Sequence, residues 1–214
     1  MATILSTKIL TSSQQNLILN AGLAYVDYEA IKIDFIGFEA PNVKNAIITS
    51  KNAGKAILKK GVSIENCFCV GEKTSSFLKN EKFKILETAT HAAELANIIT
   101  NKYKHEKFIF FCGNKRREEL PAILRNNQVD FTEIEVYKTS LNFQKFSQEF
   151  DGILFFSPSA VKSFIKENGL KDSVAFCIGK TTASEAKKHI GNIVVATTPS
   201  IENVIVQVVK YFRR

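Results

Sequence analysis

The chain has 214 residues, of which 45% are hydrophobic, and a formal net charge of +8. This length fits one large or two small domains with proper cores, and the apolar runs are too short for a transmembrane span. Because the basic residues are spread along the chain without interleaved base-stacking aromatic residues, the charge favours a small polyanionic ligand or a solvated surface over nucleic acid.

The N-terminal region predicts one strand, one helix and further extended segments. Its first residues lack the charged and continuously apolar segments of a secretory signal, so we expect a cytoplasmic protein. A short apolar strand at residues 3–6 ends at Thr7-Lys8. Ser12 or Ser13 then caps a helix that runs to about residue 20, and residues 24–36 form one or two extended segments.

Two similar units follow, each with an apolar strand, a tight polar turn and the start of a helix. The first has the sequence AIITSKNAGKAI at residues 46–57, and the second has CFCVGEKTSSFL at residues 67–78. Such a turn leaves backbone N–H groups without partners beyond the end of the strand. Together with the neighbouring hydroxyls, these N–H groups suit an anionic oxygen. A strand at 84–86 and a helix at 92–103 complete the first half.

The second half of the chain repeats this alternation. The predicted strands lie at residues 107–112, 131–136 with a further extended segment to 139, 152–156, 174–178 and 193–196. Helices follow the polar turns Gly113-Asn114-Lys115, Ser157-Pro158-Ser159 and Gly179-Lys180-Thr181-Thr182. For the last helix, Thr198 is the predicted cap and Pro199 takes the first helical position.

The two halves match as an internal duplication. Ser50 corresponds to Ser157 and Gly71 to Gly179, so the matching turns lie 21 and 22 residues apart, and the halves are offset by 107 to 108 residues. Strand–turn–helix units recur in all α/β proteins, but agreement in order, spacing and turn residues favours a true repeat.

Strands that alternate with helices predict parallel sheets with helices on both faces. The expected fold class is therefore α/β, with two lobes of similar topology. Ligands of such folds bind beyond the carboxyl ends of the strands, which is where the polar turns fall. We expect a cleft between two lobes that binds an anionic small molecule.

The four cysteines, Cys67, Cys69, Cys112 and Cys177, all lie within apolar strands. The three histidines are scattered without the spacing of metal ligands. We therefore expect buried free thiols in a reducing compartment, rather than disulfides or a metal site.

Nucleotide-binding and hydrolytic motifs are missing. Gly179-Lys180-Thr181 resembles the end of a P-loop, but the glycine required five residues earlier is Val174, and no G-x-G-x-x-G follows a strand. No nucleophile–base pair or pair of carboxylates stands out either. Any chemistry would therefore rely on conformation and electrostatics.

Five segments are informative when they are taken together: CGNKRREELP, VYKT, FSPSAVKSF, CIGKTTASEA and PSIENVI. In this order and spacing they resemble the uroporphyrinogen-III synthase family, and the resemblance covers essentially the whole chain. It implies two α/β lobes, each a parallel sheet flanked by helices, joined by two extended linker segments. Lobe one would comprise residues 1–33 and 142–214, lobe two residues 39–132, and the linker segments residues 29–38 and 133–141.

The resemblance implies a cyclising hydro-lyase of haem biosynthesis. Such an enzyme closes hydroxymethylbilane, a linear tetrapyrrole with acetate and propionate side chains, to uroporphyrinogen III. Water is lost and ring D is inverted through a spiro intermediate, whereas unassisted closure gives the uninverted isomer. The resemblance implies no cofactor or metal and favours a monomer without nucleic-acid or membrane partners. It allows transient contact with the upstream deaminase.

The family's conserved tyrosine corresponds to Tyr137, which either assists departure of the hydroxyl or packs as a linker residue against a lobe. The substrate-binding positions implied by the resemblance are Lys8, Thr49, Ser50, Lys51, Gly71, Thr74, Gly113, Asn114, Ser157, Ser159, Thr181 and Thr182. These residues also suit helix capping, and both roles are compatible because a capped turn still presents free N–H groups.

The chain departs from the family in two places. The first strand commonly ends in Thr-Arg-Pro but here continues Thr7-Lys8-Ile9, which keeps a charge and loses the bidentate geometry of arginine. A proline usual in the first linker corresponds to Glu29. The main alternative function is a non-catalytic two-lobed binding protein for an anionic small molecule. A basic nucleic-acid-binding protein and a nucleotide-dependent enzyme are weaker alternatives.

Overall fold

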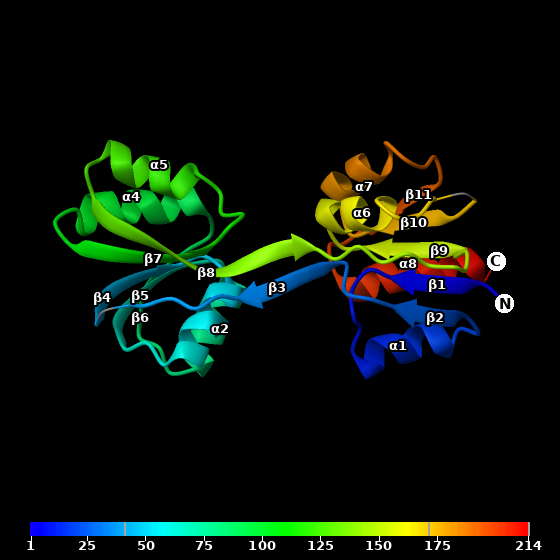
Figure 1. Ribbon diagram of the computed structural model, residues 1–214, viewed down its shortest axis with the longest axis horizontal. Coiled ribbons are helices and arrows are strands. Elements are labelled where there is room, and N and C mark those ends of the chain that lie inside the picture. Colours follow the sequence, from blue (N-terminus) through cyan, green and yellow to red (C-terminus); the bar gives the residue numbers. More distant parts are fainter. Residues whose placement is uncertain (41, 171, 214) are drawn as a thin grey trace. The chain divides into compact units, whose positions relative to one another are not determined.

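The computed structural model describes residues 1–40, 42–170 and 172–213. Positions 41, 171 and 214, which the predicted lobes also include, lie outside the described residues. The chain forms two compact units: unit 1 comprises Met1–Lys32 and Ser140–Arg214, and unit 2 comprises Ile33–Thr139. Both are layered structures of a sheet and helices (Figure 1).

Unit 1 contains a five-stranded sheet with the order β11-β10-β9-β1-β2, in which all four strand pairs are parallel. Its strands are β1 (Thr3–Ser6), β2 (Ala24–Asp27), β9 (Gly152–Phe155), β10 (Val174–Cys177) and β11 (Ile193–Val195). Its helices are α1 (Ser12–Leu19), α6 (Pro158–Ile165), α7 (Lys180–Ala186) and α8 (Ile201–Phe212).

Unit 2 contains a six-stranded sheet with the order β3-β8-β7-β4-β5-β6, and the pairs from β8 to β6 are parallel. Its strands are β3 (Ile31–Phe35), β4 (Val43–Ile48), β5 (Ile64–Val70), β6 (Ile85–Ala89), β7 (Lys107–Gly113) and β8 (Asp130–Leu141). Its helices are α2 (Lys51–Lys60), α3 (Glu72–Asn80), α4 (Ala92–Lys102) and α5 (Glu119–Asn126).

The two sheets share one topology, which confirms the predicted α/β fold and its repeat. The order β2-β1-β9-β10-β11 in unit 1 matches the order β8-β7-β4-β5-β6 in unit 2. Each sheet combines strands from both halves of the chain. Unit 1 joins β1 and β2 of the first half to β9, β10 and β11 of the second, and unit 2 joins β7 and β8 of the second half to β4, β5 and β6 of the first.

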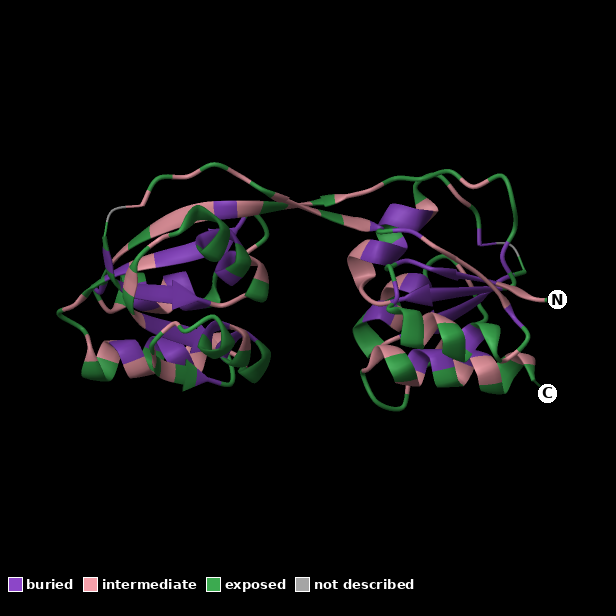
Figure 2. Cartoon of the chain, turned by 90° about the horizontal axis from the view of Figure 1, so that it is seen from below, coloured by how far each residue is buried: buried purple, intermediate pink, exposed green. Residues whose placement is uncertain are grey.

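Helices cover both faces of each sheet. In unit 1, Ile153 and Phe155 of β9 belong to the core that includes residues of α6 and α7, whereas Leu154 belongs to the core with α1 and α8. In unit 2, α2 and α3 cover one face and α4 and α5 the other. Because successive side chains of a strand point to opposite faces, such strands are buried along their whole length. Figure 2 shows the buried residues concentrated in the strands and on the inner sides of the helices.

The start of α1 differs from the predicted one. Its cap is Thr11 rather than Ser12 or Ser13, because Thr11 Oγ1 accepts a hydrogen bond from the Gln14 N–H while the Gln14 side chain accepts one from the Thr11 N–H. This reciprocal pair satisfies two N–H groups of the first turn and fixes the cap at residue 11.

The start of α8 also differs from the predicted one. Thr198 was the predicted cap and Pro199 the predicted first residue, but the helix begins at Ile201 and its cap is Ser200. Ser200 has an extended backbone, and its Oγ accepts a hydrogen bond from the Asn203 N–H at 3.2 Å. The Ser200 cap therefore satisfies the Asn203 N–H group in the first turn of α8. Pro199 lies directly before the cap, outside the helix.

Candidate functional site

The strand order of unit 2 reverses between β7 and β4, which lie side by side. In doubly wound sheets such a switch point opens a crevice beyond the carboxyl ends of the two strands. Gly113 is the last residue of β7, and Thr49 and Ser50 directly follow β4. The structure therefore brings these three predicted binding residues to the place where the topology favours a ligand.

Tyr137 of β8 lies at the same place. Its hydroxyl lies 3.1 Å from the hydroxyl of Ser50, within hydrogen-bond distance. Ser50 is the N-cap of α2, and its Oγ also accepts a hydrogen bond from the Ala53 N–H at 3.1 Å. Either hydroxyl can be the donor in this pair, and Ser50 can donate because its own hydrogen is not used in the bond from Ala53. The phenolic hydrogen of Tyr137 is then free to face another group.

Gly113 makes room for the aromatic ring of Tyr137. A Cβ atom built on Gly113 would lie 2.4 Å from Cζ and 2.6 Å from Cε2 of that ring. Only a residue without a side chain allows the ring to lie against the backbone at this point. Gly113 thus supports the tyrosine, which is half-buried against the core on the α2 and α3 side.

The side chain of Asn114 binds β8. Its Oδ1 accepts a hydrogen bond from the Thr139 N–H at 2.8 Å, and its Nδ2 donates a longer one to the Thr139 carbonyl at 3.4 Å. The backbone N–H of Asn114 donates to the Tyr137 carbonyl at 3.3 Å. The predicted ligand contact of Asn114 therefore competes with bonds that the residue already makes to its own sheet.

The other predicted positions of unit 2 surround the starts of α2 and α3. Lys51 is exposed at the start of α2, and its Nζ lies 5.1 Å from the centre of the Phe77 ring. Gly71 precedes α3 with φ of 83°, in the left-handed region that favours glycine. Thr74 lies in the first turn of α3 and is only 6% exposed, so its side chain is part of the packing.

Unit 1 carries the remaining predicted positions in the equivalent turns. Ser157 caps α6 and accepts a hydrogen bond from the Ala160 N–H at 3.1 Å, as Ser50 does in α2. Lys8 and Thr181 are exposed and Ser159 is half-buried. Thr182 is 1% exposed, which leaves almost no surface of its side chain for a ligand.

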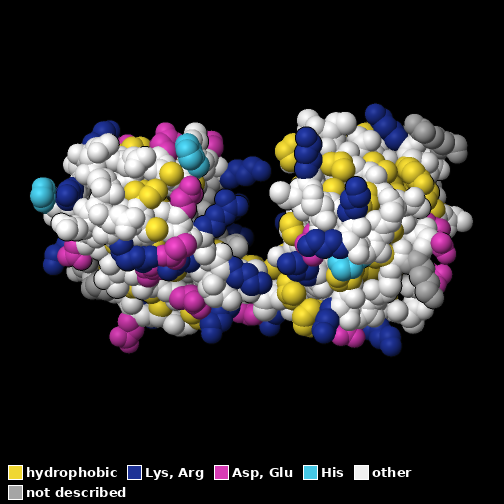
Figure 3. Space-filling model, turned by 90° about the horizontal axis from the view of Figure 1, so that it is seen from above, with side chains coloured by type: hydrophobic (Ala, Val, Ile, Leu, Met, Phe, Trp, Pro, Cys, Tyr) yellow, Lys and Arg dark blue, Asp and Glu magenta, His cyan; other side chains and the backbone are white. Residues whose placement is uncertain are grey.

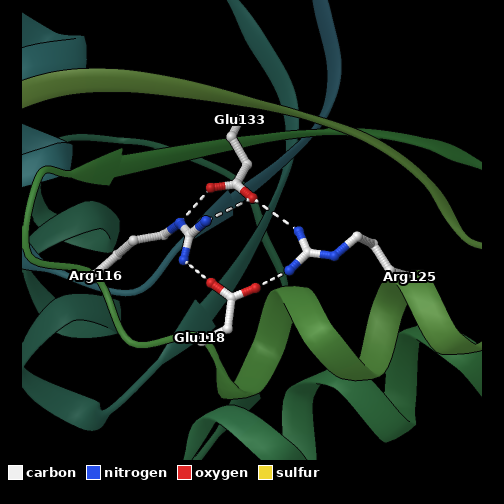
Figure 4. Close-up of polar contacts among 4 residues, drawn as sticks. All are labelled: Arg116, Glu118, Arg125 and Glu133. Atoms are coloured by element: carbon white, nitrogen blue, oxygen red, sulfur yellow. Dashed lines mark hydrogen bonds and ion pairs between the residues drawn. The ribbon is translucent and has the colours of Figure 1, made fainter.

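A group of ion pairs beside this site was not predicted from the sequence. Arg116, in the loop between β7 and α5, forms a bidentate pair with Glu133 of β8, and its guanidinium also binds Glu118 (Figure 4). Arg125 of α5 binds the same two carboxylates and closes a ring of four charges. The run Lys115-Arg116-Arg117-Glu118-Glu119 was a visible signal, but its partner Glu133 is remote in sequence.

A cavity of about 400 Å³ lies next to these charges. It is lined by Cys112, Gly113, Asn114, Arg116, Glu133 and Glu135. Basic side chains elsewhere are distributed over the visible faces of both units, interspersed with acidic ones (Figure 3). The positive charge is therefore not gathered in one patch on that face.

All four cysteines are free and buried, as predicted. Burial raises the pKa of Cys67, Cys69 and Cys177 to about 12 and that of Cys112 to about 11. These thiols therefore stay protonated and unreactive at neutral pH. Among the described residues, no three histidine, cysteine or carboxylate side chains gather as a metal site would require, and no helix is long and apolar enough to cross a membrane.

The site of unit 2 thus offers a phenol, a serine hydroxyl and backbone N–H groups at the start of α2. These groups can donate hydrogen bonds to a leaving oxygen or to a carboxylate. The described partner of the Tyr137 hydroxyl is Ser50, and not the imidazole of a hydrolytic triad.

Comparisons with known proteins point to one family. The sequence profile of the family described as "Uroporphyrinogen-III synthase HemD" matches residues 25–205. The chain is 26% identical over 172 residues to a "Putative uroporphyrinogen-III synthase" from Archaeoglobus fulgidus, covering 72% of this chain and 73% of that protein. It is 31% identical over 113 residues to the "Porphyrin biosynthesis protein HemD" of Ruminiclostridium josui, covering 48% of this chain and 22% of that protein.

A solved structure shares the fold. The crystal structure of uroporphyrinogen-III synthetase from Helicobacter pylori matches with a TM-score of 0.73 and 19% sequence identity. The match covers 99% of this chain and 100% of that chain. Both α/β units are therefore shared with that structure.

Proposed function

The chain belongs to the uroporphyrinogen-III synthase family, and on this premise we propose that it cyclises hydroxymethylbilane to uroporphyrinogen III. The observation that carries the proposal is the family match over residues 25–205, which includes every residue of the site built around Tyr137. The reaction removes one molecule of water and inverts ring D. It makes the chain a cyclising lyase, and more narrowly a hydro-lyase.

The substrate supplies both reacting carbons. Departure of the terminal hydroxyl, with one proton, forms water and leaves an azafulvene cation. The substituted carbon of ring D attacks this cation and gives a spiro intermediate, which fragments and closes again with ring D inverted. Loss of one proton from the closed ring balances the proton that left with the hydroxyl. The protein's task is to favour this path over direct closure.

Tyr137 is the proposed donor to the departing hydroxyl. Its oxygen can accept the Ser50 hydrogen, which leaves the phenolic hydrogen for the leaving group and stabilises a developing negative charge on the phenol. The phenol regains a proton when the closed ring loses one. Ser50 therefore orients Tyr137, while the turns at the starts of the helices bind substrate.

The acetate and propionate groups of the substrate match the polar turns. In unit 2 the proposed contacts come from Thr49, Ser50, Lys51 and the N–H groups after Gly71, and in unit 1 from Lys8, Ser157, Ser159 and Thr181. Backbone N–H groups at helix starts favour carboxylates, and lysines add attraction. Thr74 and Thr182 act through the packing of α3 and α7, because both side chains are buried.

The remaining features of the proposal follow from the reaction. It needs no cofactor or metal, since the leaving group and the nucleophile both belong to the substrate. The buried free thiols suit a reducing cytoplasm. We propose that the chain acts there as a monomer and receives an unstable substrate from the upstream deaminase through transient contact.

The proposal is tested by product analysis. Hydroxymethylbilane is generated in the reaction vessel by its deaminase, the chain is added, and the oxidised porphyrin isomers are separated by chromatography. Isomer III above the level without the chain is the expected result. Isomer I alone, obtained with folded protein, would favour the alternative of a non-catalytic protein that binds an anionic small molecule.

A further inference from the structure

The strand pairing beside Tyr137 is irregular. Along β7 and β8 the register runs from Lys107 opposite Asp130 to Cys112 opposite Glu135, and then shifts so that Gly113 lies opposite Tyr137. One residue of β8, Val136, is therefore extra. Such a bulge turns the following side chain away from its regular direction. It brings Tyr137 onto the same side of the sheet as Val136, and both contribute to the core with α2 and α3.

A bulge at the end of a strand pair needs support, because the backbone ladder stops there. Asn114 supplies this support with its side chain. The amide accepts from the N–H of Thr139 at 2.8 Å and donates to its carbonyl at 3.4 Å, so one side chain pairs both backbone groups of Thr139. The Asn114 side chain thus attaches the loop after β7 to β8, two residues beyond Tyr137.

The same loop is attached to β8 on the other side of Tyr137. Arg116 binds Glu133, which lies four residues before Tyr137. The bonds come from two of its three guanidinium nitrogens, Nε and Nη2. The N–H of Arg116 donates to the Gly113 carbonyl at 3.1 Å, so a tight turn joins the two attachments. Arg116 and Glu133 are only 26% and 25% exposed, which makes this pair less screened than one on an open surface.

We propose that Asn114 and Arg116 are positioning residues that hold Tyr137 at the site, and that Asn114 is not a substrate ligand. The loop of residues 113–118 fastens β8 before and after the tyrosine, at Glu133 and at Thr139. The ring of Tyr137 is held between these points, against Gly113 and 3.1 Å from the Ser50 hydroxyl. The catalytic part of this inference rests on the proposed function, but the positioning part concerns the free protein alone.

The first test compares two variants of one residue. Asn114→Asp keeps an oxygen acceptor for the Thr139 N–H, whereas Asn114→Ala removes it. If Asn114 instead donated to a substrate carboxylate, the new carboxylate of Asn114→Asp would repel the substrate and make this the more damaging change. Asn127→Ala is the control, because the Asn127 side chain binds Ile123 within α5.

The readout without substrate is nuclear magnetic resonance of the free protein. Ring currents of Tyr137 shift the Hα resonances of Gly113, and the bond to Asn114 protects the Thr139 amide from hydrogen exchange. Asn114→Ala should move the Gly113 resonances toward random-coil values and speed Thr139 exchange by about 10-fold or more. Asn114→Asp and Asn127→Ala should leave both signals near those of the unchanged chain. Unaltered signals in Asn114→Ala would overturn the inference, whatever the catalytic result.

The readout with substrate is the rate of isomer III formation. A misplaced catalytic group lowers turnover rather than binding, so Asn114→Ala should lower kcat by about 10-fold with little change in KM. Asn114→Asp should restore most of kcat. A raised KM in Asn114→Asp together with a normal kcat in Asn114→Ala would instead make Asn114 a substrate ligand. Absence of isomer III from the unchanged chain, with the resonance changes present, would refute the proposed reaction and leave the positioning of Tyr137 established.

Arg116 provides an independent second test. Arg116→Ala removes the attachment at Glu133, whereas Arg125→Ala removes a more exposed partner of the same carboxylate and leaves the Arg116–Glu133 pair in place. Arg116→Ala should shift the Gly113 resonances and lower kcat, and Arg125→Ala should do neither. Equal behaviour of the two variants would show that the charges stabilise α5 rather than position Tyr137.

Discussion

The hydroxyl of Ser50 lies 3.1 Å from the hydroxyl of Tyr137, although the two residues are 87 positions apart in the chain. Ser50 holds this place because it caps α2, and Tyr137 because its ring lies against Gly113. The contact joins the start of α2, which follows β4, to a residue of β8. The strand β7 lies between β4 and β8 in the sheet. The contact gives the phenol one fixed partner, and when Ser50 is the donor the phenolic hydrogen can bind a substrate.

Removal of the phenolic oxygen should slow the reaction without loss of the fold. Tyr137→Phe keeps the ring against Gly113 but removes the donor to the departing hydroxyl, so we expect kcat to fall by about 10- to 100-fold. The measurement is the initial rate of isomer III formation, with circular dichroism as the check on folding. An unchanged kcat would remove Tyr137 from the chemistry.

Tyr28→Phe is the matched control for that variant. Tyr28 is 4% exposed in unit 1, and its hydroxyl has no hydrogen-bond partner within the described chain. A buried oxygen without a partner is unfavourable, so this change should leave kcat unchanged and raise the free energy of unfolding by up to about 1 kcal/mol. Chemical denaturation measures the latter.

Ser50→Ala should affect both stability and catalysis. Loss of the cap of α2 should lower the free energy of unfolding by about 1 kcal/mol, and loss of the Tyr137 partner should lower kcat by about 10-fold. Ser200→Ala removes the comparable cap of α8, whose oxygen accepts from Asn203 at 3.2 Å. It should cost similar stability and leave kcat unchanged. Equal catalytic effects in the two variants would mean that Ser50 acts only as a cap.

Gly113→Ala should displace Tyr137. The added carbon would lie 2.4 Å from Cζ of the ring, which is too close for any contact, so either the ring or the backbone of β7 must move. We expect a loss of about 1–3 kcal/mol in stability and a fall in kcat of at least about 10-fold. Gly191→Ala is the control, because no described atom lies within 4 Å of its added carbon. A fully active Gly113→Ala enzyme would contradict the position of the ring.

The four buried thiols predict a loss of stability at alkaline pH. Unfolded cysteines release their protons near pH 9, whereas burial keeps the folded thiols protonated up to about pH 11 or 12. Between these values the unfolded state binds fewer protons, so the free energy of unfolding falls as pH rises, by up to about 1.4 kcal/mol per pH unit for each thiol. Denaturation curves between pH 8 and pH 11 measure this slope.

Thiol reagents give an independent check on that prediction. At neutral pH the folded chain should react slowly at all four cysteines, and denaturant should release four reactive thiols. Rapid reaction of one thiol in the folded protein would show that its strand is accessible and would reduce the expected alkaline slope.

The α/β class and the repeat were predictable because both depend on local patterns. Short apolar strands, polar turns and helix starts recur at a fixed offset, so Ser50 and Ser157 could be matched before any contact was known. The two caps indeed bind their helices in the same way, at 3.1 Å in each case. Local signals failed at the caps of α1 and α8, where several hydroxyl residues lie close together before the helix.

The contacts of the site were less predictable, because they depend on pairing between distant strands. A repeated sequence is compatible with two halves that fold separately or with two halves that exchange strands. The pairs β1–β9 and β4–β7 join strands from different halves, so the halves share their sheets. The place of Tyr137 depends on a shift of one residue after Cys112. No periodicity in the sequence marks that shift, and the roles of Asn114 and Arg116 follow from it.

The most direct test of the central claim is the dependence of isomer III formation on the concentration of this chain. At a fixed supply of hydroxymethylbilane, we predict that the initial rate of isomer III formation rises in proportion to added chain, while isomer I falls correspondingly. Heat-denatured chain should leave isomer I as the product. Formation of isomer I alone at every concentration of folded chain would contradict the assignment of this protein as a cyclising synthase.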